Sequence, residues 1–105
     1  MTDPVIVFLD RATLAPEIAL RRPSYPHAWR EYDRTAPDRV AERVRDAAVV
    51  IVNKVRLDRA AIDAAPRLRL VLVSATGTDN VDLEACRDHG IPVRNVAGYG
   101  ATSVA

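Results

Sequence analysis

Cysteine, histidine and glycine are all scarce in this sequence of 105 residues. The single cysteine, Cys86, excludes a disulfide framework and a four-cysteine zinc site. The two histidines, His27 and His89, stand far apart, so no metal-ligand cluster is predicted. Only four glycines are present, which leaves few positions for a Gly-rich phosphate-binding loop.

An excess of charge of one sign and a long apolar run are missing as well. Fifteen Lys and Arg stand against 14 Asp and Glu, a net charge of +1, which argues against a nucleic-acid or membrane partner. The apolar stretches fall short of the roughly 20 residues that a membrane span needs. The amino-terminal run is also too short for a signal peptide. We therefore expect a soluble domain located in the cytoplasm.

Strand and helix patterns alternate along the chain with short links between them. Continuous apolar runs without alternation are typical of strands that are buried on both faces of a parallel sheet. The patterns predict strands over 5–9, 28–34, 48–52, 68–73 and 91–96, and helices over 36–47, 58–65 and 81–89, with a short helix or turn over 10–20. This alternation predicts an α/β fold, a flavodoxin-like parallel sheet of about five strands in the order 2-1-3-4-5 with helices on both faces.

Several polar residues have the spacing of helix caps. Asp58 is expected to cap the helix that follows it, and Asp79 or Asn80 the next one. Gly90 is placed as the residue just past the end of that helix. Trp29 and Tyr32 are interpreted as packing at the edge of the sheet, Cys86 as a small core residue and His89 as a surface residue.

The loops at the carboxyl ends of the strands are where a ligand would bind in such a sheet. Three qualify: 10–11, 53–55 and 75–77. Lys54 offers a positive charge, Asn53 an amide, and Gly77 a close backbone approach, a set that suits a small anion such as a carboxylate. Spacing alone, however, favours ordinary solvated turns at these positions.

A dinucleotide-binding fingerprint is not complete in this chain. Gly98 and Gly100 form G-x-G, but Ser103 occupies the place of the last glycine, and the expected acidic residue would lie beyond the end. Neither a Ser-His-Asp set nor paired carboxylates stand out, so no catalytic residue and no metal ligand are predicted.

The sequence LVLVSATGTDNVDLEACRDHGIPVRNVAGYGATSVA, residues 70–105, closely resembles the D-isomer-specific 2-hydroxyacid dehydrogenases. The resemblance rests on a strand, the TGTDNVD stretch, a helix, GIPV, NVAG and the beginning of a helix at Ser103-Val104-Ala105. The strand and loop IVNKV at 51–55 also resemble the glycerate dehydrogenase and hydroxypyruvate reductase members. This chain has Thr78 where the family often has an aromatic residue.

The resemblance implies a two-domain enzyme that uses NAD or NADP. Residues 1–100 would be the amino-terminal segment of its substrate-binding domain, and residues 101–105 would begin the helix that crosses into a Rossmann cofactor domain. The family's Gly-rich cofactor loop and its catalytic Arg, Glu and His lie beyond Ala105. Neither His27 nor His89 is assigned to the catalytic role.

The resemblance also implies which residues of this chain line the site. Asn53 and Lys54 match a loop on the carboxylate side of the substrate, and Thr76 with Gly77 lies against the substrate. Thr76 also reaches the nicotinamide end of the cofactor, and Val104 matches a cofactor contact.

The implied reaction interconverts a D-2-hydroxy acid and a 2-keto acid such as hydroxypyruvate or glyoxylate. The intact parent is expected to be a homodimer, and the 105 residues alone are expected to be inactive. Two alternatives remain: a stand-alone flavodoxin-like module that binds a small anion or regulates a partner, and an interaction protein that pairs through an edge strand at 28–34.

Overall fold

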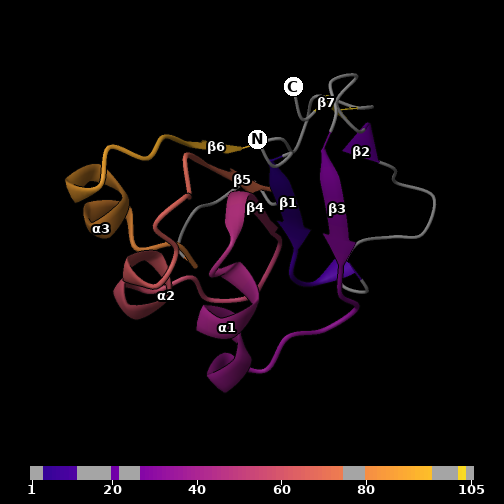
Figure 1. The fold of residues 1–105 in the computed structure, drawn as a ribbon, viewed down its shortest axis with the longest axis horizontal. Coiled ribbons are helices and arrows are strands. Elements are labelled where there is room, and N and C mark those ends of the chain that lie inside the picture. Colours follow the sequence, from indigo (N-terminus) through magenta and orange to yellow (C-terminus); the bar gives the residue numbers. More distant parts are fainter. Residues whose placement is uncertain (1–3, 12–19, 22–26, 75–79, 96–101, 104–105) are drawn as a thin grey trace.

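A five-stranded parallel sheet forms the centre of the computed structural model, which describes residues 4–11, 20–21, 27–74, 80–95 and 102–103 (Figure 1). The order β3-β1-β4-β5-β6 corresponds to 2-1-3-4-5 among the strands of this sheet, so the predicted parallel α/β architecture is confirmed. Its strands are β1 (Val5–Phe8), β3 (Ala28–Glu31), β4 (Ala47–Val52), β5 (Leu70–Val73) and β6 (Val93–Asn95).

The central strands are apolar because both faces of the sheet are covered. All six residues of β4 are buried, and β4 pairs in parallel with β1 on one side and with β5 on the other. Alternate residues of each strand enter two separate apolar clusters: Val50 and Val52 face one, and Val49 and Ile51 the other. A continuous apolar run is therefore needed here, and an alternating one would place polar groups in a cluster.

The described helices all pack on one of these two faces (Figure 1). They are α1 (Val40–Val44), α2 (Arg59–Asp63) and α3 (Leu83–Asp88), with a short 3-10 turn, η2 (Pro37–Arg39), before α1. Val40 and Val44 of α1 are buried against the sheet, as their spacing predicts. Most of the segment expected to form a short helix or turn, 10–20, lies outside the described residues, so helices on both faces stay a prediction.

The ends of α2 and α3 are fixed by local hydrogen bonds. The Asp58 carboxylate accepts from the Ala61 N–H at 3.0 Å, which confirms the predicted cap of α2. The cap of α3 is Asp82, which accepts from the Ala85 N–H at 3.0 Å, so the predicted caps Asp79 and Asn80 were wrong. The physical reason is that Val81 pairs with Leu57 in a parallel bridge, as described below, and the helix begins only beyond it.

Gly90 ends α3 in the way its position predicts. Its φ is +69°, a left-handed conformation that is strained for residues with a Cβ. The N–H of Ile91 donates to the Cys86 carbonyl at 2.8 Å and the N–H of Gly90 donates to the Arg87 carbonyl at 3.1 Å. These two bonds form a Schellman motif, which satisfies the last carbonyl groups of the helix.

Two predicted elements differ from the structure. The helix predicted over 36–47 is reduced to η2 and α1, because Ala47 already pairs with Val5 as the first residue of β4. A helix was expected to begin at Ser103, but Thr102–Ser103 form a strand, β7, that pairs in parallel with β2 (Leu20–Arg21). The pairing gives the backbone groups of both segments hydrogen-bond partners, whereas the first turn of a helix is costly to nucleate.

None of the described helices is long and apolar enough to cross a membrane.

Candidate functional site

The candidate site lies at the point where the order of the strands reverses. β1 is flanked by β3, which follows it in this sheet, and by β4, which comes next. The chain therefore leaves β1 toward one side and later returns to its other side. In parallel α/β sheets, the crevice beyond the carboxyl ends of the two strands at such a reversal is the usual place for a ligand. Here it is bordered by Asp10, after β1, and by residues 53–55, after β4.

Asp10 joins the two sides of this crevice. Its carboxylate is buried, with 1% of the residue exposed. One oxygen accepts a hydrogen bond from the Asn53 N–H at 2.8 Å. The other accepts from the N–H groups of Lys54 and Val55, the latter at 2.8 Å. Three successive main-chain donors thus converge on one carboxylate, which compensates for burying its charge.

Asn80 holds the same loop from its other side. Its Nδ2 donates to the carbonyl groups of Asn53 at 3.3 Å and Val55 at 2.9 Å. The Asn80 carbonyl accepts from the Leu57 N–H at 2.7 Å, and Leu57 forms a parallel bridge with Val81. The bridge holds Val81 in a strand-like pairing, which is why α3 is capped by a later residue.

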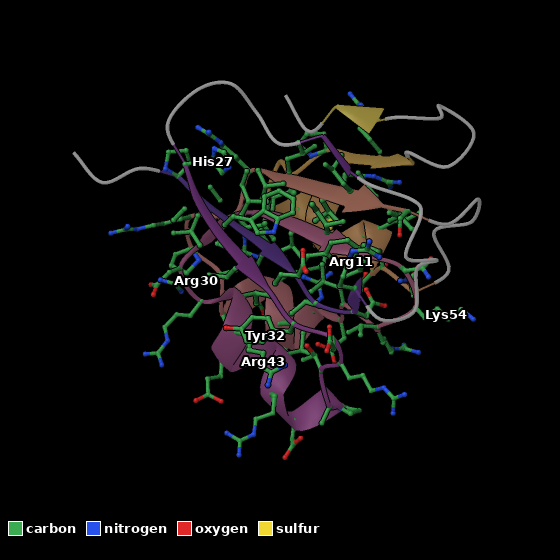
Figure 2. All side chains as sticks on the ribbon, turned by 90° about the vertical axis from the view of Figure 1, so that its right-hand side faces the viewer. Arg11, His27, Arg30, Tyr32, Arg43 and Lys54 are labelled. Carbon is green, nitrogen blue, oxygen red and sulfur yellow. The ribbon has the colours of Figure 1, made fainter. Side chains whose placement is uncertain are left out.

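Lys54 is the exposed member of this loop. Figure 2 shows its side chain pointing away from the ribbon. Among the described residues, its ammonium group has no ion-pair or hydrogen-bond partner, while its main-chain N–H donates to Asp10. A ligand anion would therefore meet the side-chain charge of Lys54, because the N–H groups of 53–55 already have an acceptor. Of the two residues of this loop that were predicted to contact the substrate, Asn53 is half-buried, and the exposed Lys54 is the one whose side chain can reach a ligand.

The end of β1 is tied down by a second group of side chains. The buried Thr35 hydroxyl donates to the Leu9 carbonyl at 2.6 Å and accepts from Arg43 Nη1 at 2.8 Å. The Arg43 guanidinium carbon lies 4.0 Å from the centre of the Tyr32 ring, a cation–π contact that is visible in Figure 2. This group fixes the residue immediately before Asp10, and Tyr32 packs at the edge of the sheet as predicted.

The remaining predicted site residues cannot be placed. Thr76, Gly77 and Val104 lie outside the described residues, so their roles stay predictions. The sequence interpretation missed Asp10 and Asn80 as the groups that hold the loop. The available signal was a single acidic residue directly after a buried strand at the predicted site.

The residues that were not assigned to a site occupy ordinary positions. His89 Nε2 lies 2.7 Å from Asp63 Oδ1 on the exposed surface between α3 and α2. The His27 and Trp29 rings meet edge to face, 6.2 Å apart. Cys86 is buried in the core, and burial raises the pKa of its thiol, with a smaller contribution from the Asp82 carboxylate. In the part of the chain that is described, no group of three or more His, Cys, Asp or Glu residues could hold a metal ion.

The beginnings of α2 and α3 do not fit the pyrophosphate of a dinucleotide. A pyrophosphate is usually bound by free N–H groups at the beginning of a helix. At the beginnings of α2 and α3, the carboxylates of Asp58 and Asp82 accept these N–H groups and would repel a phosphate. The beginnings of α2 and α3 therefore do not offer a site for the pyrophosphate of a dinucleotide.

Comparisons with known proteins agree with this geometry. Residues 13–105 match the family described as D-isomer specific 2-hydroxyacid dehydrogenase, catalytic domain. A Haemophilus influenzae protein provisionally named 2-hydroxyacid dehydrogenase is 48% identical over 99 residues, which are 94% of this chain and 31% of that protein. A glycerate dehydrogenase of Methylorubrum extorquens is 37% identical over 100 residues, with the same coverage of 94% and 31%. The chain thus spans about a third of the length of these relatives.

A similar fold is found among solved structures. The NAD+-bound 3-phosphoglycerate dehydrogenase of Entamoeba histolytica superposes with a TM-score of 0.70 and 23% identity, over 90% of this chain and 33% of that one. At this identity the likeness establishes the fold alone. The family itself follows from the match over residues 13–105: the chain belongs to the D-isomer specific 2-hydroxyacid dehydrogenase family, whose catalytic-domain model it matches.

Proposed function

We propose that this chain forms the substrate-binding part of an oxidoreductase that interconverts a D-2-hydroxy acid and a 2-keto acid with NAD or NADP. Residues 1–100 are the amino-terminal segment of the substrate-binding domain, and 101–105 lead into a cofactor domain. The observation that carries the proposal is the family match over residues 13–105, in a chain whose strand reversal brings the Lys54 loop to the expected ligand position.

The proposed substrates are hydroxypyruvate and glyoxylate. Relatives named glycerate dehydrogenase, hydroxypyruvate reductase and glyoxylate reductase are 37%, 40% and 35% identical over 100, 76 and 91 residues. These molecules are small carboxylates, and the exposed ammonium group of Lys54 at the end of β4 can bind a carboxylate through a charge-assisted hydrogen bond. The cofactor, NAD or NADP, supplies or accepts the hydride when it is bound. Structural neighbours solved with NAD+ and with NADP support this choice of cofactor.

The residues of this chain bind and orient the substrate in this proposal. Lys54 attracts the carboxylate, and Asn53 keeps the loop in place through its carbonyl group, which accepts from Asn80. Thr76 and Gly77 line the substrate, and Thr76 and Val104 approach the cofactor. The catalytic groups belong to another segment of the parent enzyme, so the 105 residues alone do not turn over substrate. The parent is a cytoplasmic homodimer.

The test uses the full-length protein that contains these residues. We expect it to oxidise NADH or NADPH in the presence of hydroxypyruvate or glyoxylate, while the 105-residue chain has no activity. Lys54→Gln should raise KM for the acid about fivefold, the size of one exposed charge–charge contact. Arg45→Gln is the control, because Arg45 is also an exposed cation. It precedes β4, whereas Lys54 follows β4, so the two side chains lie at opposite ends of this strand. Equal effects of the two substitutions would contradict the assigned role of Lys54.

The same experiment addresses the stand-alone module. If the full-length protein reduces neither acid but the 105-residue chain binds oxalate in a calorimeter, the anion-binding alternative replaces the enzyme. The occupation of the N–H groups of 53–55 by Asp10 argues against that outcome, since the usual backbone donors for an anion are taken.

A further inference from the structure

A buried carboxylate such as that of Asp10 is unusual beside an exposed loop such as 53–55. A carboxylate that is 99% buried is costly unless its charge is fully compensated by hydrogen bonds. Its main-chain partners lie 43 to 45 residues away, on a different strand end, so they do not form a local capping motif. A loop that only connected β4 to α2 could remain solvated and would need no buried ion.

We propose that Asp10 is a positioning residue for the substrate site, an inference that rests on the proposed function. Its carboxylate fixes the main chain of 53–55 against the end of β1, and this determines where the Lys54 side chain emerges. Because the Lys54 N–H is itself bound to Asp10, the carboxylate acts on the residue whose ammonium group meets the substrate. A loop held in advance loses less conformational entropy when the substrate binds, which lowers KM.

The chemistry of the side chain matters as much as its shape. A carboxylate presents two acceptor oxygens, and here both are used. An amide at this position has one acceptor oxygen, and its NH2 group would face a main-chain N–H, donor against donor. Asp10→Asn therefore keeps the volume of the side chain but releases at least one of the three N–H groups.

Activity measurements on the full-length protein separate positioning from general stability. We expect Asp10→Asn to raise KM for hydroxypyruvate about fourfold, no more than Lys54→Gln does, while kcat changes less than about twofold. Asp58→Ala is the control for general stability, because it removes a carboxylate that accepts a main-chain N–H at the beginning of α2, whereas the described hydrogen bonds to the N–H groups of 53–55 come from Asp10. Equal changes of KM in the two variants, or no change in Asp10→Asn, would overturn the proposal.

A double substitution tests whether Asp10 acts through Lys54. In the background of Lys54→Gln, Asp10→Asn should raise KM less than about twofold, because the charge that it positions is gone. An undiminished effect of about fourfold in that background would contradict positioning. If Asp10→Asn does not fold, Asn80→Ala loosens the same loop from its carbonyl side and should show the same dependence on Lys54.

Amide hydrogen-exchange rates test whether Asp10 holds the loop, independently of whether the proposed enzymatic function is correct. In Asp10→Asn, the amides of Lys54 and Val55 should exchange at least tenfold faster, while the amide of Leu57, which is bound to the Asn80 carbonyl, should keep its rate. If the wild-type protein reduces neither acid, the proposed function is wrong, and the exchange rates still decide whether Asp10 holds the loop. If the enzyme is active and these rates do not change, the proposed function stands and positioning by Asp10 is wrong.

Discussion

Replacing Thr35 by valine should destabilise the protein by removing the hydroxyl group that holds the end of β1. Thr35 is 9% exposed, and its hydroxyl makes two hydrogen bonds, to the Leu9 carbonyl at 2.6 Å and from Arg43 Nη1 at 2.8 Å. Valine has nearly the same shape and can make neither bond. A buried carbonyl that loses its partner costs about 1–3 kcal/mol, so we expect Thr35→Val to cost about 2 kcal/mol.

Part of the network should survive this change. Arg43 keeps its hydrogen bond to the Arg34 carbonyl at 2.7 Å and its contact with the Tyr32 ring. We therefore expect no unfolding, but a decrease of the melting temperature by about 8–16 °C in a domain of about this size. Thr35→Ser is the control, since it keeps the hydroxyl and loses one methyl group, at a cost of about 0.8 kcal/mol.

Urea unfolding of both variants, with the same m-value as the wild type, gives the two free energies. If Thr35→Val lies within about 0.5 kcal/mol of the wild type, or if serine costs as much as valine, the hydroxyl does not hold the end of β1 and the reasoning is refuted.

Two further predictions concern α3. Gly90→Ala should lower the free energy of unfolding by about 1 kcal/mol because of its φ of +69°, although nothing lies within 4 Å of the added Cβ, and Gly90→Asn should cost less; thermal unfolding compares them. Burial raises the pKa of the Cys86 thiol, so the folded state keeps this proton more tightly than the unfolded state. The free energy of unfolding should therefore fall as pH rises above the thiol's ordinary value of 9.0, and Cys86→Ser should remove this slope. A slope that persists in Cys86→Ser would assign it to other groups.

The strands were predictable because they depend on local composition. The run Val5-Ile6-Val7-Phe8 and the run 47–52 are apolar without interruption, and no other regular structure of that length suits a position between two covered faces. Their order followed from which strands are most apolar, since Ala28–Glu31 and Val93–Asn95 lie at the edges of the sheet.

The beginning of α3 and the strand Thr102–Ser103 could not be predicted in the same way. Asp79, Asn80 and Asp82 can all cap a helix by residue type. The choice among them is made by the bridge between Leu57 and Val81, a contact between distant segments. Likewise Thr102–Ser103 become a strand only because Leu20–Arg21 lie beside them.

Three aspartates show where this limit lies within the candidate site. Asp58 and Asp82 each accept the N–H of the residue three positions later, a local spacing that identified Asp58 in the sequence but did not distinguish Asp82 from Asp79 and Asn80. The Asp10 carboxylate likewise accepts hydrogen bonds from main-chain N–H groups, but these lie 43 to 45 residues away in the sequence. The sequence could therefore predict that the loop after β4 lies at the site, because strand ends follow from the topology. It could not predict what holds that loop in one conformation, because the group that does so belongs to the other side of the strand reversal.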